Sequence, residues 1–450
     1  MKVQLFYPKS QLNTYVNNGV YFSLTLLNIA SYVKFYRPDI DIEIWDGELY
    51  SNEELIKKLD KNSDVVGISC TSFNYPHALI LAQHAKDLGL YVVLGGNHPT
   101  YYKKKILENR SFIDGVFVGK GEYAFLKLLN EKDKANVPNF IWRDGDKIRE
   151  NSENKSISIN EMPYLDYSLL ELNKYSTNHQ KVYPNLPGNP LSVLTHEGCA
   201  KREKYGPCSF CAMRTKLAFK DPTIFWQETE KAVQKYGFNI VRDWGDSLTE
   251  DKDFFSRLVN SRPESLKDLS FSVYSTIASM DADKIELLKK LNVKMLFAAI
   301  ESGSDKILNT MNKQATSEQM FRAMELIGKT GISVMASYVL GERGEDIESL
   351  ESTLNIAEKT QKIANITVAN GSPINITPGS SDFELLAQKF PELKNQDLLD
   401  MDELRDLWVK NFCPKLPNAD ILKEYAEKIG KLGNLKTNYG WEKAEKLNKE

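Results

Sequence analysis

The stretch that decides the fold reads Thr195-His-Glu-Gly-Cys-Ala-Lys-Arg-Glu-Lys-Tyr-Gly-Pro-Cys-Ser-Phe-Cys-Ala-Met213. It holds Cys199, Cys208 and Cys211, three of the chain's five cysteines, whereas five cysteines in 450 residues are too few for a disulfide framework. The Cys-x2-Cys pair can direct two thiolates to one metal or cluster. The longer first gap contains a Gly-Pro turn that lets the third thiolate return from the other side.

The spacing of these cysteines leaves three alternatives open. Thiolates are the usual ligands of iron–sulfur clusters, where four cysteines cap every iron, so three would leave one iron free for a substrate or cofactor. The segment also fits a structural zinc site with His196 as the fourth ligand. The third alternative is a set of unliganded thiols, which is how we interpret Cys70 and Cys413.

Short β-rich runs alternate with helical stretches through the N-terminal third of the chain. This alternation predicts a doubly wound, Rossmann-like parallel sheet with ligand-binding loops at the carboxyl ends of its strands. The expected strands are Val3–Tyr7, Ile42–Trp45, Val65–Ser69, Tyr91–Leu94 and Val116–Val118.

A second alternation begins near Leu191, and the cysteines follow its first strand. Six strands with intervening helices predict an open or partial (β/α)6 barrel, with an eight-stranded barrel as the competing count. The expected strands are Leu191–Thr195, Ile240–Trp244, Leu269–Tyr274, Met295–Ile300, Ile332–Leu340 and Ile366–Asn370. We therefore expect a first domain over residues 1–135, a linker over 136–187, the barrel over 188–382 and a helical C-terminal cap over 383–450.

The overall charge excludes some classes of partner. The formal net charge is −3 and the isoelectric point is near 6.1, so the whole chain offers no electrostatic basis for binding nucleic acid. No run of about 18 apolar residues could span a bilayer, and the N-terminus lacks a signal-peptide pattern. We expect a cytoplasmic protein without a membrane or nucleic-acid partner.

In this context the chain resembles the radical S-adenosylmethionine (SAM) superfamily, in particular the branch with an N-terminal cobalamin-binding domain. The family motif is Cys-x3-Cys-x2-Cys with an aromatic residue before the last cysteine. Phe210 occupies the aromatic position, whereas the first gap here has eight residues. Four later stretches are similar to family motifs in the same order: Arg242–Ser247, Ala299–Lys313, Gly331–Glu342 and Thr377–Ser380.

The resemblance implies a [4Fe–4S] cluster on Cys199, Cys208 and Cys211. It implies a SAM site in which Asp246 accepts from the ammonium group, although Asp246 could instead be a solvated loop carboxylate or a helix N-cap. Ser275 stands where the family often carries a basic residue. The expected SAM-binding residues are Phe210, Gly245, Asp246, Ser275, Glu301, Ser302 and Leu340; no catalytic residue is expected beyond the cluster and SAM ligands.

Three loops after the third, fourth and fifth strands resemble the family's cobalamin-binding loops. The Asp-x-His-x-x-Gly signature is absent, Lys120 replaces a glutamate of the usual Gly-Glu-Gly-Glu, and His98 fits a polar loop residue better than a cobalt ligand. The alternative is a Rossmann-like sheet that has lost its ligand. The expected cobalamin-binding residues are Thr71, Ser72, Gly95, Gly96, Thr100, Gly119, Gly121 and Glu122.

The function implied by the resemblance is reductive cleavage of SAM to a 5′-deoxyadenosyl radical, followed by cobalamin-dependent methylation of an unactivated centre. A cyclase, dehydratase or dehydrogenase with a degenerate cobalamin domain is the alternative within the family. A non-catalytic iron–sulfur or zinc protein is the alternative outside it. The expected partners are a small-molecule or peptide substrate and an electron donor such as flavodoxin or ferredoxin.

Overall fold

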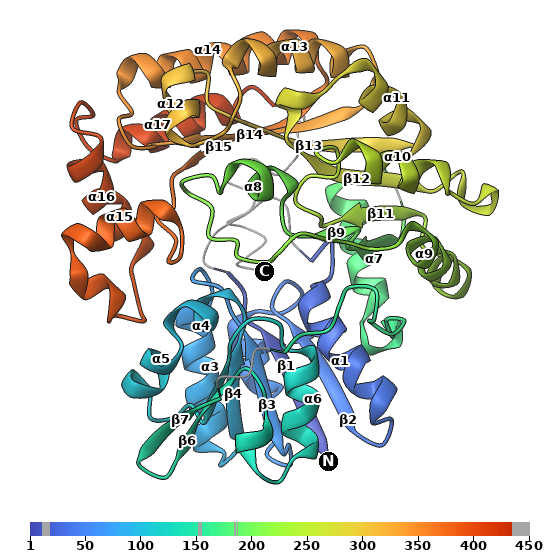
Figure 1. The fold of residues 1–450 in the computed structure, drawn as a ribbon, viewed down its shortest axis with the longest axis vertical. Coiled ribbons are helices and arrows are strands. Elements are labelled where there is room, and N and C mark those ends of the chain that lie inside the picture. Colours follow the sequence, from blue (N-terminus) through green and yellow to red (C-terminus); the bar gives the residue numbers. More distant parts are fainter. Residues whose placement is uncertain (11–18, 152–154, 184–185, 187, 434–450) are drawn as a thin grey trace. The chain divides into compact units, whose positions relative to one another are not determined.

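A computed structural model describes residues 1–10, 19–151, 155–183, 186 and 188–433, which form two compact units. Unit 1 contains Met1–Pro190 and Ala387–Leu399, and unit 2 contains Leu191–Leu386 and the chain from Asp400 onward. Figure 1 shows a β-sheet with surrounding helices in each unit. This division differs from the four segments expected from sequence, because the described residues of 136–187 and residues 387–399 belong to unit 1.

Unit 1 is built on a seven-stranded sheet in the order β2-β1-β3-β4-β5-β6-β7. Strands β1 to β5 pair in parallel, as predicted, while β6 and β7 add antiparallel strands at one edge. The strands are β1 (Lys2–Tyr7), β2 (Asp41–Asp46), β3 (Val65–Ser69), β4 (Tyr91–Gly95), β5 (Gly115–Phe117), β6 (Phe140–Asp144) and β7 (Lys147–Glu150).

Helices cover both faces of this sheet because its strands are apolar on both sides. Val3 and Leu5 of β1 pack in one core cluster with α1 and α6, and Phe6 packs in the opposite cluster with α3 and α5. The helices of unit 1 are α1 (Leu24–Tyr36), α2 (Asn52–Lys57), α3 (Tyr75–Asp87), α4 (Asn97–Tyr102), α5 (Lys104–Asn109), α6 (Glu122–Asn130) and α7 (Leu172–Val182).

The expected linker is part of unit 1. Phe140, Ile141 and Trp142 of β6 are buried, and Gly145 at φ +59° forms the turn into β7. Further on, Tyr175 of α7 donates a hydrogen bond to buried Asp46 at 2.7 Å. The segment is polar and weakly periodic, so only its pairing with the distant strand β5 shows that it belongs to the sheet.

Unit 2 contains a six-stranded sheet in the order β15-β14-β13-β12-β11-β8. The neighbours from β11 to β15 pair in parallel, and the described residues give the six strands of the partial barrel rather than eight. The strands are β8 (Pro190–Val193), β11 (Ile240–Asp243), β12 (Ser270–Ser275), β13 (Val293–Glu301), β14 (Ser333–Leu340) and β15 (Ile366–Pro373).

Helices connect successive strands of unit 2, and in Figure 1 α13 and α14 lie along the outer side of its sheet. The connecting helices are α9 (Pro222–Tyr236), α10 (Lys252–Asn260), α11 (Ala282–Lys290), α12 (Asp305–Thr310), α13 (Ser317–Gly328) and α14 (Ile347–Ile363). The expected C-terminal cap is helical where it is described, with α15 (Ser381–Lys389), α16 (Met401–Phe412) and α17 (Asp420–Gly430). The remainder of that cap, 434–450, lies outside the described residues.

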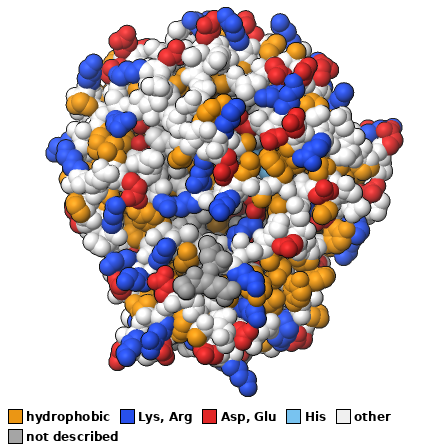
Figure 2. All heavy atoms as spheres, viewed as in Figure 1, with side chains coloured by type: hydrophobic (Ala, Val, Ile, Leu, Met, Phe, Trp, Pro, Cys, Tyr) orange, Lys and Arg blue, Asp and Glu red, His pale blue; other side chains and the backbone are white. Residues whose placement is uncertain are grey.

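The surface agrees with the composition. On the face shown in Figure 2, basic and acidic side chains are interspersed. No helix in the described part of the chain combines the length and apolar character that a bilayer crossing requires.

Asp397 attaches the segment Ala387–Leu399 to the rest of unit 1. Its buried carboxylate accepts hydrogen bonds from Tyr75 at 2.6 Å, Asn109 at 2.8 Å and Arg110 at 2.9 Å. Burial alone would raise the pKa of this carboxyl group, but the hydrogen bonds from Arg110, Tyr75 and Asn109 hold it below its ordinary value. The charged form of Asp397 therefore stabilises unit 1.

We expect Asp397→Asn to lower the free energy of unfolding of unit 1 by about 2–3 kcal/mol, because Arg110 loses its charged partner. The pKa of Asp397 is lowered on folding. The wild type is therefore more stable than the variant above the unfolded-state pKa of about 4, and this difference in unfolding free energy shrinks as the pH falls below it. Denaturant unfolding at pH 7 and pH 3 measures this difference. Glu392→Gln, at an exposed site in the same segment, is the control; equal losses in both variants would contradict the prediction.

Candidate functional site

The cysteine loop follows β8 and is closed at its base by a short ribbon. Strand β9 (His196–Glu197) pairs antiparallel with β10 (Ala218–Phe219). Gly198 joins this ribbon to Cys199 at φ +73°, where an added Cβ would lie 2.7 Å from the backbone nitrogen of Leu217. A side chain at position 198 would therefore be both strained and blocked.

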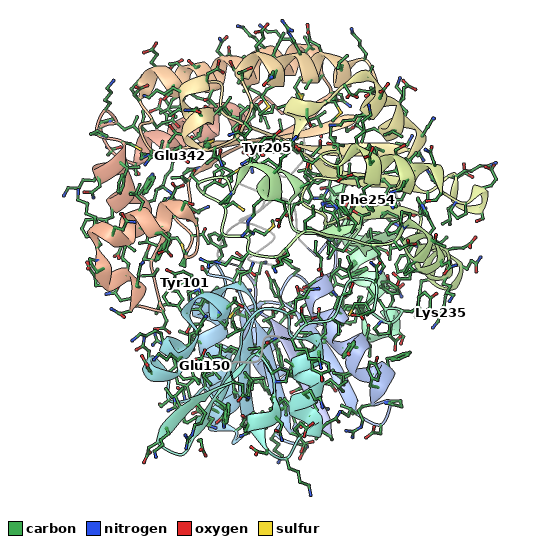
Figure 3. The ribbon with its side chains drawn as sticks, in the orientation of Figure 1. Tyr101, Glu150, Tyr205, Lys235, Phe254 and Glu342 are labelled. Carbon is green, nitrogen blue, oxygen red and sulfur yellow. The ribbon has the colours of Figure 1, made fainter. Side chains whose placement is uncertain are left out.

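The long first gap of the motif forms a helix and a turn. Cys199 precedes α8 (Ala200–Tyr205), and Gly206 at φ +84° reverses the chain toward Cys208. Asn312 holds this turn, since its side-chain nitrogen donates to the carbonyl oxygens of Tyr205 at 3.0 Å and Pro207 at 2.9 Å. Tyr205 is labelled beside α8 in Figure 3. The gap therefore has a defined path through α8.

The three cysteines are free thiols that lie close enough to influence one another. Burial raises the pKa of Cys199, and the neighbouring charges of Asp246 and Cys208 raise it further. Burial likewise raises the pKa of Cys211, with added contributions from Cys208, Asp246 and Cys199. Each thiol retains some exposure to solvent. The structure thus groups the three predicted ligands with Asp246.

The geometry does not support a zinc site with His196. This residue is buried, its Nδ1 atom lies 2.9 Å from the hydroxyl of Thr195, and its Nε2 atom accepts from the backbone nitrogen of Ser247 at 3.4 Å. Within the described residues, no three His, Cys, Asp or Glu side chains converge on a single metal position. In an iron–sulfur cluster each thiolate binds a different iron, so the cysteine sulfurs need not converge on one point.

Asp243 organises the loop that follows β11. Its buried carboxylate accepts from the backbone nitrogens of Thr195 and Gly245, both at 3.0 Å, and from the Thr195 hydroxyl at 2.6 Å. A Cβ on Gly245 would lie 2.3 Å from the His196 ring. Position 245 thus requires glycine because the ring packs against it.

Asp246 has a carboxyl group with a strongly shifted pKa. Surrounding protein and the adjacent Asp243 raise that pKa to about 7, although the residue keeps an exposed face. The side chain that caps α10 is that of Asp251, which accepts from the Phe254 nitrogen at 2.7 Å. The N-cap alternative for Asp246 is therefore wrong, and the residue is available for a cationic ligand.

The predicted SAM residues of the next strands have partners inside the protein. Glu301, at φ +68° where the register between β13 and β14 shifts, accepts from buried Lys313 at 2.8 Å. The Ser302 hydroxyl lies 3.1 Å from that of Thr353, and Ser275 likewise contacts Thr249. Half-buried Phe210 lies in the cysteine loop, and Leu340 ends β14, where its carbonyl accepts from Ile374 at 2.7 Å.

The predicted cobalamin residues meet at the carboxyl ends of β3, β4 and β5 in unit 1. Thr100 connects two of these loops, because its hydroxyl donates to the Gly96 carbonyl at 2.8 Å and accepts from the Gly119 nitrogen at 2.9 Å. Among the described residues, a Cβ on Gly119 would meet no atom within 4 Å, and one on Gly95 only Phe117 at 3.9 Å. The backbone at these two glycines is open to a ligand.

Other members of this group have structural roles. Gly96, at φ +103°, packs against the backbone of Cys70, since an added Cβ would lie 2.4 Å from the Cys70 carbonyl oxygen. The Thr71 hydroxyl lies 3.3 Å from the side-chain oxygen of Asn74. Gly121 and Glu122 form the start of α6. Gly96 thus allows close approach between two loops of unit 1.

His98 is buried, not a polar loop residue at the surface. Its Nδ1 atom lies 3.0 Å from the Ser72 hydroxyl and its Nε2 atom 2.9 Å from the Asp397 carbonyl. The ring stacks on Tyr75 with centroids 3.9 Å apart, and burial lowers its pKa to about 4. Both ring nitrogens are engaged, so His98 is not placed to bind cobalt, and the Ser72 hydroxyl is also used within the protein.

Comparison with family models accounts for both sheets. The model of the B12 binding domain matches residues 18–129, and that of the radical SAM superfamily matches residues 193–357. The chain belongs to the radical SAM superfamily and carries an N-terminal B12-binding domain. The two matched ranges hold the loops at the strand ends of unit 1 and the cysteine segment of unit 2, respectively.

Relatives of this radical SAM protein include methyltransferases and cyclases. It is 25% identical over 374 residues to an uncharacterised methyltransferase of Pyrococcus horikoshii, covering 77% of this chain and 76% of the relative. It is 24% identical over 429 residues to the anaerobic magnesium-protoporphyrin IX monomethyl ester cyclase of Rubrivivax gelatinosus, covering 88% and 74%.

Solved structures share the fold. The radical SAM methyltransferase TsrM from Kitasatospora setae, determined with cobalamin and a [4Fe–4S] cluster bound, superposes with a TM-score of 0.64 at 15% identity, covering 86% of this chain and 75% of that one. The cobalamin-dependent radical SAM enzyme OxsB gives 0.60 at 17% identity, covering 88% and 56%. These likenesses establish the arrangement of a B12-type sheet followed by a radical SAM sheet.

Sequence reasoning missed an acid pair beside the cysteines of this radical SAM protein. The Ser209 hydroxyl donates to Glu342, and the Ser209 carbonyl accepts from the Asp382 nitrogen at 3.1 Å. Burial raises the pKa of Glu342, and burial together with the charge of Glu342 raises the pKa of Asp382 to about 7. Glu342 ends one quoted motif and Asp382 lies two residues after another, but their contact with the cysteine loop is a tertiary feature. Figure 3 labels Glu342.

We expect alanine at Cys199, Cys208 or Cys211 to abolish iron loading, because each thiolate supplies one of the three ligands. Cys413→Ala should load like the wild type, since this buried thiol donates to the Glu342 carbonyl at 3.2 Å, outside the cysteine loop. Iron and sulfide per chain after anaerobic reconstitution, with the visible absorption of the cluster, measure the effect. Full iron content in any of the three loop variants would contradict the ligand assignment.

Proposed function

We propose that this protein cleaves SAM reductively at a [4Fe–4S] cluster and uses the resulting radical for cobalamin-dependent methylation of an unactivated centre. The observation that carries the proposal is the grouping of three free thiols with Asp246 after the first two strands of the radical SAM sheet. When bound, the cluster would supply the electron that divides SAM into methionine and a 5′-deoxyadenosyl radical, and cobalamin would supply the methyl group.

The residues of unit 2 suit the charged groups of SAM. Three cysteines would cap three irons, so the amino and carboxylate groups of SAM could chelate the fourth. Asp246 keeps an exposed face beside these thiols and can accept hydrogen bonds from the SAM ammonium. The backbone of the same loop packs against the His196 ring at Gly245, next to Asp246.

The loops of unit 1 suit a corrin held without a histidine from this site. Gly95 and Gly119 leave open backbone at two strand ends, and Thr100 fixes the two loops to each other. His98 uses both ring nitrogens inside the protein. We therefore propose that backbone groups and shape, rather than imidazole ligation by His98, retain the cofactor.

A radical cyclase is the second candidate. The relative from Rubrivivax gelatinosus, which covers 88% of this chain, is named as a cyclase. In that case the same radical would act without methyl transfer, and the B12-type domain could be degenerate. A low-potential donor such as flavodoxin or ferredoxin, and a small-molecule or peptide substrate, are proposed for either activity.

The decisive experiment is a SAM cleavage assay. Reconstituted protein with dithionite and SAM should form 5′-deoxyadenosine, whereas Cys208→Ala should form none. Absence of the nucleoside in the wild type, at full iron content, would overturn the enzyme proposal in favour of a non-catalytic iron–sulfur protein. Methyl transfer is assigned only if turnover also requires cobalamin; corrin-free protein that turns over would support the cyclase alternative.

Asp246→Asn should weaken SAM binding about tenfold to a hundredfold, because a hydrogen bond to a charged group is worth roughly 1.5–3 kcal/mol. The dissociation constant can be measured from the change that SAM produces in the spectrum of the cluster. Asp253→Asn, in the exposed first turn of α10, is the matched control. Equal affinities in the two variants would remove Asp246 from the SAM site.

Thr100→Val should lower the amount of cobalamin that co-purifies, because the isosteric change removes the hydroxyl that connects the Gly96 and Gly119 loops. We expect at least a several-fold loss of occupancy with an unchanged circular dichroism spectrum. Expression with added hydroxocobalamin, followed by visible spectroscopy of the purified protein, measures this. Thr310→Val, on α12 of unit 2, is the control; full occupancy in Thr100→Val would count against a corrin at these loops.

A further inference from the structure

The long first gap of the cysteine motif places a buried cation against one of the predicted ligands. Lys201, in the first turn of α8, is 6% exposed. Its ammonium group donates to the Gly206 carbonyl at 3.0 Å and to the sulfur of Cys208 at 3.5 Å. Each of the other charged side chains of this helix is more exposed than Lys201.

A buried ammonium requires compensation, and the two hydrogen-bond acceptors of Lys201 are a carbonyl oxygen and a sulfur. The charge of Lys201 lowers the pKa of Glu250 slightly, but burial has the largest influence on that carboxyl group and raises its pKa. Lys313, another buried cation near these thiols, already forms a 2.8 Å ion pair with Glu301. A thiolate at Cys208 would therefore provide Lys201 with an anionic hydrogen-bond partner.

The gap is built so that this ammonium stays in place. The Gly206 turn that accepts from Lys201 is held by Asn312, and the nitrogen of Ser209 donates to the Met311 carbonyl at 3.1 Å. Arg202 connects α8 to the Met213 carbonyl on the far side of the cysteines. The turn that accepts from Lys201 is thus held by contacts to Asn312 and Met311, and Arg202 attaches α8 beyond the cysteines.

We propose that Lys201 is a positioning residue that raises the reduction potential of the cluster through its charge and its hydrogen bond to the Cys208 sulfur. Reduction adds one electron, taken from a low-potential donor, to a cluster already surrounded by three thiolates. A nearby cation stabilises the added negative charge, and hydrogen bonds to cluster sulfurs and net charge are established determinants of such potentials. The eight-residue gap thus contributes Lys201, whose charge favours reduction of the cluster.

This inference rests on the cluster ligation proposed above, and its test separates the two. The [4Fe–4S] form of the whole protein, without SAM, is titrated with dithionite and mediators while electron paramagnetic resonance follows the reduced cluster. Absence of any cluster signal in the wild type would refute the ligation itself. A wild-type signal whose midpoint does not respond to Lys201 would refute only the inference.

Lys201→Gln and Lys201→Met should move the midpoint to more negative potential, so that the ratio of reduced to oxidised cluster at the wild-type midpoint falls about tenfold, equivalent to ~59 mV for a one-electron couple. Lys201→Arg should keep the midpoint close to the wild-type value because it retains the charge. Lys204→Gln removes the same charge from the exposed side of α8 and should leave the midpoint unchanged.

Two results would overturn the proposal. One is an equal midpoint in Lys201→Gln and Lys204→Gln at full iron content. The other is failure of both neutral variants to take up iron while Lys201→Arg loads normally, because the lysine would then serve loop folding or cluster assembly and not the potential.

Discussion

Parallel pairing places the carboxyl ends of neighbouring strands at the same edge of a sheet, and the candidate sites of both units depend on that constraint. In unit 2 it brings the loops after β8 and β11 together, so that Thr195, Asp243 and the cysteine segment share one hydrogen-bonded network. In unit 1 it brings the loops after β4 and β5 within reach of a single threonine hydroxyl. Helices on the faces of each sheet leave these edges for ligand chemistry.

Buried polar groups then determine which side chains at those edges remain available. Asp243 is fully committed to backbone and hydroxyl donors, whereas its neighbour Asp246 keeps an exposed face and a raised pKa. Glu301 is paired with Lys313, while Lys201 contacts a cysteine sulfur. Residues of the same type thus have different roles: a side chain whose hydrogen bonds are satisfied within the protein is structural, and one without such partners remains available for a ligand.

The parallel strands of both sheets and the cysteine set were predictable because each produces a local pattern. The β-rich runs expected from the sequence overlap β1 to β5, β8 and β11 to β15, and Cys199, Cys208 and Cys211 lie close together in the chain. The roles of His98 and Gly96 were not predictable. His98 is oriented by Asp397, almost three hundred residues away, and Gly96 packs against the Cys70 backbone.

The sequence by itself determined the two α/β architectures, their order and the three thiols that group at one loop, since these follow from periodicity and short-range spacing. Only the tertiary structure decided that residues 140–150 extend the first sheet and that Ala387–Leu399 joins unit 1. It also decided that Lys201, in the long gap of the cysteine motif, donates a hydrogen bond to the sulfur of Cys208. The physical reason is that these features are contacts between segments, whose partners no local pattern encodes.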